Sequence, residues 1–428
     1  MRSDTAIADL HAVEILDSRG RPTVQTSCRL AGGAMATVSV PSGASTGAAE
    51  AHELRDLDPA RYGGLGCRTA VANVNGEVLT ALTGADAADQ AAIDQALLDL
   101  DGTENKARLG ANAILSVSLA VARASAIAAG RPLYERFAEI AGLDTAVDRL
   151  SRPTVNLFSG GKHAGGQIPI QDVLITSLAD TADVAMEQIV AVFNAAAALC
   201  REKYGMRTLV ADEGGLAPDF ASVDAAFEDA IAAVERAGLR PGEEIAICLD
   251  VASSHFFADG RYHIDGQALT AEGMIDVIDR WLDRWPIVSV EDGLAEDDWE
   301  HWPALRERIA GRALVLGDDF LTTNPARIRR AIDTGAANAL LLKVNQIGTL
   351  TEAAEALRLA RDAGWAVVVS ARSGETEDDW LTDLATGWRG DQLKVGSVTR
   401  SERLAKWNRL LTLADATGLS LAPWPKAT

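Results

Sequence analysis

Short apolar runs that end on a charged residue recur through the second half of the chain. The clearest is Ala339 to Leu342, which ends at Lys343 and passes into a polar turn. Runs of roughly four to eight apolar residues between turn signals are typical of strands buried on both faces. The run ends stand about 22 to 41 residues apart, the length of a strand, a helix and two loops. They fall at Asp250, Glu291, Asp318, Lys343, Arg372 and Lys394.

This spacing predicts repeated βα units and a parallel barrel, in which all strand ends open on one face. A single lysine at a strand end can simply extend its ammonium group to solvent. One or two charged residues can be explained by structural ion pairs, without any function. Six charged side chains in successive units are not explained in that way. We therefore predict that three carboxylates, two lysines and an arginine converge on one site.

The beginning of the chain follows another pattern. Residues 5–40 alternate between apolar and polar positions and turn like an antiparallel meander, and helical patterns follow at 86–100 and 112–129. The βα rhythm occupies the rest of the sequence. We therefore predict an α+β N-terminal cap domain over residues 1–140 and a βα (TIM-like) barrel over residues 141–428.

Composition narrows the possible partners and the compartment. The 61 acidic and 40 basic residues give a net charge of −21, which argues against binding to nucleic acid or to anionic membranes. The four cysteines are scattered without a CxxC pair, and the N-terminus has no basic-then-apolar signal pattern. We expect a cytoplasmic protein. The most apolar stretch, residues 111–130, is interrupted by polar residues and is expected to be a buried helix.

Three further stretches contain candidate functional residues. Residues 40–47 are rich in Gly and Ser and could offer hydroxyl and backbone groups to phosphate or metal, although an ordinary turn fits them as well. His163 lies in a glycine-rich loop, followed by Gln171 and Asp172 on a predicted strand. Alone, this histidine is explained more simply as structural. The pair Asp212-Glu213 is predicted to stand at another strand end.

Taken together, these stretches resemble the enolase family, to which the glycolytic 2-phosphoglycerate dehydratase belongs, over nearly the whole chain. Runs this long and this numerous are highly specific. The resemblance implies a small α+β domain on a barrel that begins ββαα, with one antiparallel strand. The matching runs include Leu16-Asp17-Ser18-Arg19-Gly20, residues 40–47, Leu109 to Leu115, Asp212-Glu213-Gly214-Gly215, Glu291-Asp292, Leu340 to Thr349, Ser373 to Asp378 and Arg400 to Lys406.

The resemblance also implies a magnesium enzyme. Asp250, Glu291 and Asp318 match the ligands of a first Mg²⁺, and Ser45 matches the serine that helps to hold a second one at the substrate when its loop closes. Hard cations prefer such oxygen ligands. We expect two Mg²⁺ ions per active site and a small anionic substrate, a phosphorylated or phosphonylated carboxylate.

The residues that move protons are carried over in the same way. Lys343 matches the general base, Glu213 the general acid and Lys394 the lysine beside the substrate carboxylate. Removing a proton α to a carboxylate creates a dianion, which cations and Lys394 would stabilise. Nearby metal and lysine charge would lower the pKa of Lys343, so that it can act as a base.

The remaining site residues match the phosphate-binding pair and two further positions. Arg372 and Ser373 are the pair, and His163 and Gln171 are the other two. Two residues depart from the family pattern: Ala371 stands where a histidine is usual, and Asp172 where a glutamate works with the general acid.

Residues 395–398 depart as well, reading Val-Gly-Ser-Val in place of Thr-Gly-Ala-Pro. The proton-abstraction half is therefore intact, whereas the half that serves the departing β-hydroxyl and the phosphate is altered. A misplacement of about 1 Å can cost on the order of a hundredfold in rate. The departures in this half are therefore expected to affect which substrate the protein turns over.

The family pairs two arginines with two glutamates across a dimer interface. The matching positions here are Val13 with Asp415, and Thr412 with Gln25, so both arginines are absent. We expect a homodimer with an altered interface, in which Asp415 stays solvated because an unpaired buried charge is costly.

Three functions stay open at this point. One is an ordinary or weakened carbon–oxygen lyase acting on 2-phosphoglycerate. Another is a paralogue retuned for a different reaction, such as a transfer, for which carboxyphosphonoenolpyruvate synthase of phosphonate biosynthesis is the best match. The third, a non-catalytic enolase-like binding protein, is disfavoured because an inactive scaffold has no need of six crowded charges. Metal titration separates the third from the other two.

Overall fold

An antiparallel meander opens the chain, as the alternating pattern predicted. The strand order is β1-β2-β3, with Leu10 opposite Cys28 and Cys28 opposite Ala36, so these small and apolar side chains share one buried face. The structure is a computed structural model that describes residues 4–43, 47, 49–207 and 209–424. The three strands are β1 (Ile7–Leu16), β2 (Pro22–Leu30) and β3 (Met35–Ser39).

Helix α4 (Ala111–Ala128) packs across β2 and β3 and confirms the predicted buried helix. It is apolar and long enough to cross a membrane, as is α7 (Ala182–Tyr204), but 83% of the α4 window and half of the α7 window are buried inside the fold. Two hydroxyl groups of α4 find partners in the core: Ser116 bonds Thr26 at 2.7 Å, and Ser118 accepts from the Leu350 backbone N–H at 3.2 Å. A buried helix with satisfied polar groups is the simpler account of its composition.

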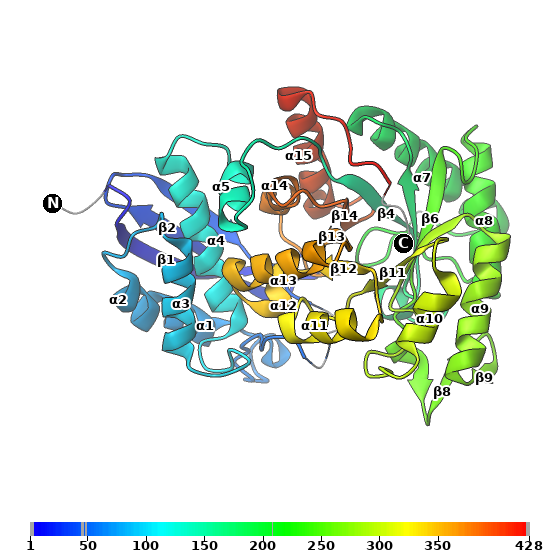
Figure 1. Cartoon of the computed structure of the whole chain (residues 1–428), viewed down its shortest axis with the longest axis horizontal. Helices are drawn as coiled ribbons and strands as arrows, with labels where there is room; N and C mark the ends of the chain where they lie inside the picture. The colour runs from blue at the N-terminus through cyan, green and yellow to red at the C-terminus, as the bar shows by residue number, and fades with distance from the viewer. Residues whose placement is uncertain (1–3, 44–46, 48, 208, 425–428) are drawn as a thin grey trace.

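The other helical elements of this first domain surround the sheet and α4 (Figure 1). They are η1 (Tyr62–Gly64), α1 (Arg68–Asn73), η2 (Val74–Val78), α2 (Leu79–Leu82), α3 (Gln90–Asp101) and α5 (Leu133–Ile140).

A closed eight-stranded barrel follows, in the order β4-β5-β6-β10-β11-β12-β13-β14. Strand β5 is antiparallel to both neighbours and all other pairs are parallel, so the barrel begins ββαα as the family resemblance implied. The strands are β4 (Arg152–Ser159), β5 (Asp172–Ser177), β6 (Ile245–Asp250), β10 (Ile287–Glu291), β11 (Leu314–Gly317), β12 (Ala339–Leu342), β13 (Ala366–Ser370) and β14 (Gln392–Gly396).

Helices cover the outside of the barrel, and a small separate sheet projects from it (Figure 1). The helices after α7 are α8 (Val223–Arg236), α9 (Ala271–Arg284), α10 (Trp302–Ile309), α11 (Pro325–Thr334), α13 (Leu350–Asp362), α14 (Trp380–Gly387) and α15 (Ser401–Thr417). The short elements are α6 (Gly161–Ala164), η3 (Ser253–Phe256), α12 (Val344–Ile347), and the strands β7 (Phe257–Ala258), β8 (Arg261–Ile264) and β9 (Gln267–Leu269).

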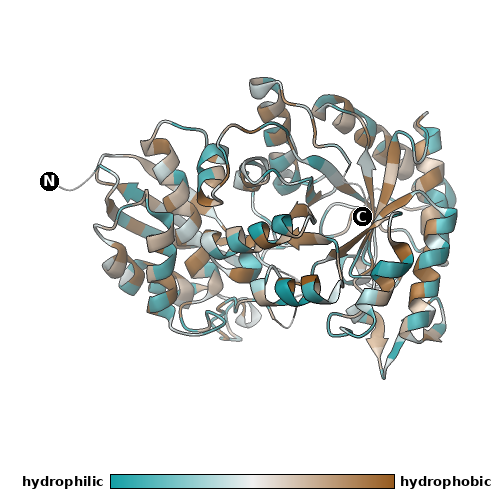
Figure 2. Ribbon diagram, viewed as in Figure 1, coloured by the Kyte–Doolittle hydropathy of each residue, from teal (hydrophilic) through white to brown (hydrophobic). Residues whose placement is uncertain are grey.

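The barrel strands are buried on both faces, so strands such as β12 and β13 read in the sequence as nearly unbroken apolar runs (Figure 2). In β12, Leu340 and Leu342 join the core that packs under the helices, whereas Ala339 and Leu341 join a second cluster with alternate residues of β11 and β13. That second cluster lies on the opposite face of these three strands. Each fully buried leucine contributes roughly 1.5–3 kcal/mol, so the frame that holds the strand ends is rigid.

The predicted division at residues 140/141 falls where α5 ends, and the first barrel strand begins at Arg152. The boundary between the two domains stays a prediction.

Candidate active site

Six charged side chains lie at the C-terminal ends of the barrel strands. Asp250 and Glu291 are the last residues of β6 and β10, and Lys394 lies within β14. The other three follow directly or within two residues of β11, β12 and β13, namely Asp318, Lys343 and Arg372. All are buried except Lys343, whose side chain is 13% exposed. The structure therefore brings the six predicted residues to one end of the barrel.

The carboxylates are bridged by the lysines. The ammonium group of Lys394 lies 2.8 Å from Asp250 Oδ2 and 2.7 Å from Glu291 Oε2, and Lys343 pairs with Asp318. Burial disfavours the charged form of Asp250, but Lys394 outweighs it and lowers the pKa of this carboxyl to about 2. Because these side chains reach across the barrel mouth, the cavity between them measures only about 20 Å³.

The ion pair with Asp318 favours the charged form of Lys343. Burial lowers the pKa of Lys343, but the carboxylate of Asp318 raises it above the ordinary value. Neighbouring positive charge alone therefore does not produce a neutral lysine here. Loss of the Asp318 partner is the change that would free it.

The oxygen atoms at this end suit a hard divalent cation. Gln171 donates to Asp250 Oδ2 at 3.1 Å, while its own Oε1 is buried without a hydrogen-bond partner in the described part of the chain. Burial and then the charge of Asp250 raise the pKa of Glu291 well above its ordinary value. An added cation would relieve that crowding, and an all-oxygen donor set is the one that Mg²⁺ prefers. Ser45, the predicted ligand of a second ion, lies outside the described residues.

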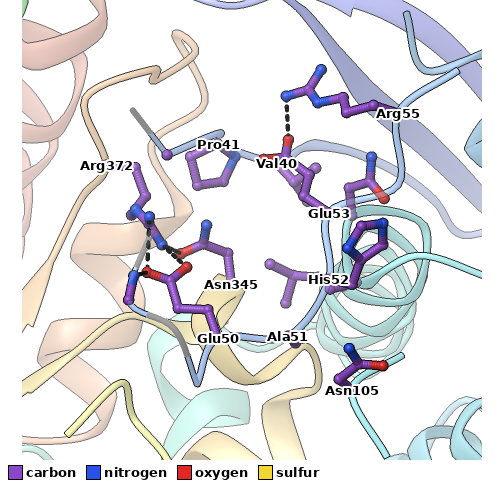
Figure 3. Close-up of a pocket in the computed structure, with 15 residues that line it drawn as sticks. Val40, Pro41, Glu50, Ala51, His52, Glu53, Arg55, Asn105, Asn345 and Arg372 are labelled. Atoms are coloured by element: carbon purple, nitrogen blue, oxygen red, sulfur yellow. Dashed lines mark hydrogen bonds and ion pairs between the residues drawn. The ribbon is translucent and has the colours of Figure 1, made fainter. Parts of the chain in front are cut away.

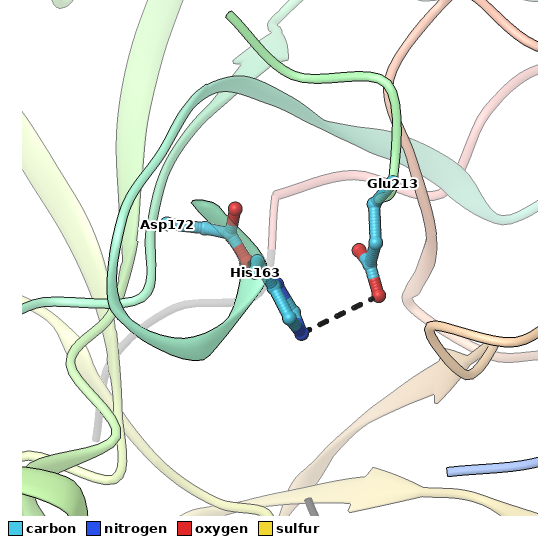
Figure 4. A group of neighbouring side chains, drawn as sticks. All are labelled: His163, Asp172 and Glu213. Carbon is cyan, nitrogen blue, oxygen red and sulfur yellow. Dashed lines mark hydrogen bonds and ion pairs between the residues drawn. The ribbon is translucent and has the colours of Figure 1, made fainter. Parts of the chain in front are cut away.

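A second cluster faces this one and consists of His163, Asp172 and Glu213 (Figure 4). Nδ1 of His163 lies 2.9 Å from Asp172 Oδ2, and its Nε2 lies 3.8 Å from Glu213 Oε1. Burial alone would lower the pKa of His163, but the carboxylates of Glu213 and Asp172 raise it to about 9. The histidine therefore carries its proton at neutral pH and contacts both acids, while one oxygen of Asp172 and one of Glu213 lie within 4.8 Å of each other.

Both oxygens of Asp172 are occupied. Ser159 donates to Oδ1 at 2.6 Å and His163 takes Oδ2, and the side chain is fully buried. Asp172 thus lies behind the histidine as an orienting group. Asp172 does not itself line the cavity that Glu213 lines.

The prediction that Glu213 stands at a strand end is wrong. It lies in a turn held by bridges of Leu216 to Val210 and to Phe158. Two consecutive glycines follow Glu213, and the first, Gly214, has a φ of +88°, which a strand does not allow. Asn156 in β4 donates to Glu213 Oε2 at 3.0 Å and fixes the direction of the carboxylate.

Glycine is also needed beside Glu213, in the segment 395–398. Gly396 has a φ of +114°, and a Cβ there would lie 2.7 Å from the Glu213 backbone oxygen. Ser397 donates its backbone N–H to that same oxygen at 2.8 Å. The altered segment therefore still supports the turn that carries Glu213.

Arg372 is bound by a carboxylate from the first domain. Its two terminal nitrogens lie 2.9 and 3.2 Å from the oxygens of Glu50, and Asn345 accepts a third bond at 3.3 Å (Figure 3). Ser373 accepts from Arg19 at 3.1 Å. Arg372 lines both the small cavity and an adjoining one of about 450 Å³. The predicted phosphate pair thus stands where the two domains meet.

Three polar residues that contact this site were not predicted. Gln346 donates to Asp318 Oδ1 at 2.9 Å, Glu50 pairs with Arg372, and Asn156 holds Glu213. Asn156 could have been suspected, because it is a polar residue in the middle of an apolar strand. Gln346 follows Lys343 closely but is ordinary in a turn, and only the domain contact reveals Glu50.

Comparison with protein families agrees with the motifs. The family model for the enolase N-terminal domain matches residues 7–137, and that for the enolase C-terminal TIM barrel domain matches residues 148–422. The two matches follow one another in the order of the fold and cover most of the chain. The family resemblance drawn from the motifs is thereby confirmed. This chain belongs to the enolase family.

Proposed function

We propose that the protein is a cytoplasmic, Mg²⁺-dependent carbon–oxygen lyase of the enolase type. It acts on 2-phosphoglycerate, phosphoenolpyruvate or a close enolpyruvate analogue through an enolate. The observation that carries this proposal is the pairing of Lys343 and Lys394 with three strand-end carboxylates, opposite the cluster of His163 and Glu213. A basic group and an acid thus face each other across one cavity, as a dehydration requires.

Lys343 takes the α-proton of the substrate in this proposal. Asp318 would serve a bound cation in place of the Lys343 ammonium group, and the pKa of Lys343 would then fall toward the range in which it can accept a proton. The backbone N–H of Lys343 donates to Thr323 Oγ1 at 2.9 Å, which holds the base in place during the transfer.

Asp250, Glu291 and Asp318 would hold a first Mg²⁺, with Ser45 at a second. When bound, Mg²⁺ supplies positive charge to the substrate carboxylate as the proton leaves. Lys394 contributes from the protein side. Burial disfavours its charged form, but the carboxylates of Asp250 and Glu291 outweigh burial and raise its pKa well above the ordinary value. Lys394 stabilises the developing dianion next to the substrate carboxylate.

Glu213 takes a proton from His163 and passes it to the departing β-hydroxyl, which leaves as water. Burial opposes its ionised form, but His163 outweighs it and lowers the pKa of Glu213. His163 is therefore the proton reservoir, and Asp172 holds it in the productive direction. Arg372 and Ser373 orient the phosphate, and Gln171 positions Asp250.

The departures at Ala371 and Asp172 lead to a testable difference between the two halves. The α-proton should exchange faster than phosphoenolpyruvate forms, because Ala371 supplies no donor to the cavity that it lines. The double change Ala371→His and Asp172→Glu should raise dehydration of 2-phosphoglycerate by about tenfold or more and change exchange much less. Ultraviolet absorbance of phosphoenolpyruvate measures the first rate, and NMR in deuterated water the second.

Residue 172 is tightly packed, so the test needs a control for stability. A glutamate at position 172 must displace Ser159 or His163, and overpacking costs roughly 1–3 kcal/mol. Each single variant should therefore be compared by melting temperature as well. A native protein that already dehydrates 2-phosphoglycerate at about 10 per second would contradict the idea that this half is retuned.

The same two departures favour a second candidate, a carboxyphosphonoenolpyruvate synthase-like enzyme of phosphonate biosynthesis. The two candidates share the proton-abstraction half and differ in the group that leaves or is transferred. Side-by-side assays with 2-phosphoglycerate and with a phosphonate analogue distinguish them. Absence of Mg²⁺ binding would instead favour a non-catalytic enolase-like binding protein.

A homodimer with an altered interface belongs to the proposal. Asp415 and Thr412 are exposed on α15, and Gln25 donates to Ser39 within its own chain at 2.9 Å. Asp415 forms no ion pair within the described residues, which fits an interface without the usual arginines. Light scattering after size exclusion measures the assembly.

A further inference from the structure

Asp292 follows Glu291 and is a buried carboxylate that the proposed chemistry does not use. Its Oδ1 accepts the backbone N–H of Asp318 at 3.0 Å, and its Oδ2 accepts the backbone N–H of Asp319 at 2.8 Å. Each oxygen is thus aimed at the backbone of the next strand end. The Asp292 carboxylate therefore fixes the backbone of Asp318, whose side chain is a proposed cation ligand.

The backbone of Asp292 is tied on both sides as well. Its N–H donates to Leu316 in β11 at 3.0 Å, and its carbonyl accepts from Ser253 at 3.1 Å, at the start of η3, which follows β6. One residue therefore joins the ends of β6, β10 and β11. These are the three strands that carry Asp250, Glu291 and Asp318.

The backbone conformation of Asp292 is unusual for a residue other than glycine. Its φ of +45° lies in the left-handed region, where a residue other than glycine needs support from its surroundings. Asp and Asn are among the few side chains that tolerate this region. Four hydrogen bonds, two from the side chain and two from the backbone, provide that support.

We propose that Asp292 is a positioning residue for the divalent-cation site, which it builds by fixing three strand ends to one another. It acts through Asp318 and the neighbouring loops, and its oxygens serve N–H groups. The inference rests on the proposed function, because it presumes that Asp250, Glu291 and Asp318 hold a cation. Outer partners of metal ligands typically change affinity by roughly ten- to a hundredfold when they are replaced.

Titration calorimetry with MgCl₂ alone tests this inference. The variant Asp292→Asn still tolerates the left-handed backbone conformation and keeps one acceptor oxygen. Its NH₂ group, however, is a donor placed opposite a backbone N–H, so one of the two hydrogen bonds is lost. We expect its magnesium Kd to rise by about tenfold or more over wild type. Asp292→Glu keeps the charge but not the reach and is expected to bind magnesium more weakly as well.

Asp391→Asn is the matched control. Asp391 is also buried and accepts a backbone N–H, from Val367 at 2.8 Å, but it lies at the opposite end of the strands. This variant should lower the melting temperature and leave the magnesium Kd unchanged. Equal weakening by Asp292→Asn and Asp391→Asn would overturn the inference, because it would indicate general destabilisation.

The remaining outcomes are also decisive. An unchanged Kd in Asp292→Asn, or wild-type binding in Asp292→Glu, overturns the positioning role while the proposed function stands. If wild type binds no magnesium, the proposed function itself fails. Should neither variant fold, amide hydrogen exchange of segment 314–321 in the intact wild-type protein decides. Slow exchange of the backbone N–H groups of Asp318 and Asp319 is expected, and rapid exchange contradicts the role.

Discussion

Replacing Lys343 with alanine is expected to slow exchange of the substrate α-proton with deuterated water by at least about a hundredfold. The reason is that Lys343 lies at the end of β12, paired with Asp318 and lining the cavity shared with Glu213. Alanine removes the basic nitrogen and leaves the carboxylates in place. Magnesium affinity should therefore be kept or increase, since Asp318 no longer competes for an ammonium group. NMR in deuterated water measures the exchange, and calorimetry the affinity.

Lys106→Ala is the control for this variant. Lys106 is a buried lysine that also pairs with a carboxylate, Glu352 at 2.9 Å, but it does not stand at a strand end of the barrel. Its loss should lower the melting temperature and preserve exchange. Exchange at the wild-type rate in Lys343→Ala would show that another group removes the proton.

Replacing Glu291 with glutamine should weaken magnesium binding by roughly tenfold or more and remove most turnover. Glutamine removes one negative charge from the proposed ligand set and one partner of Lys394, which then pairs with Asp250 alone. Turnover in this variant should recover in part as magnesium is raised. The Lys343→Ala defect should not, because its missing group is a base.

Glu352→Gln provides the comparison, since it breaks the Lys106 ion pair away from the strand ends. Its magnesium Kd should match wild type. If Glu291→Gln bound magnesium with wild-type affinity, the assignment of Glu291 as a ligand would be wrong.

The strand ends could be predicted from sequence because the barrel strands are buried on both faces. A short, unbroken apolar run such as Ala339–Leu342 is typical of a buried strand, and the charged residue after it marks the end. The buried helix at Ala111–Ala128 was predicted for the same reason, from an apolar composition interrupted by small polar residues. Both predictions depend on local pattern alone.

The contacts between elements could not be predicted in this way. Glu213 lies in a turn because Gly214 bends the chain and Gly396 allows its close approach, and these two positions are far apart in sequence. Similarly, Asp172 was expected to work directly with the general acid. The structure has His163 contact both carboxylates, with Nδ1 2.9 Å from Asp172 and Nε2 3.8 Å from Glu213. Such arrangements are set by tertiary packing.

Magnesium-dependent removal of the α-proton is the property on which the proposed function depends most. Proton NMR of 2-phosphoglycerate in deuterated water, with the native protein and either MgCl₂ or EDTA, measures it directly. We predict loss of the α-proton signal with magnesium and retention of that signal with EDTA, whether or not phosphoenolpyruvate accumulates. An α-proton signal that persists with magnesium present, at a protein concentration equal to that of the substrate, would contradict the proposed function.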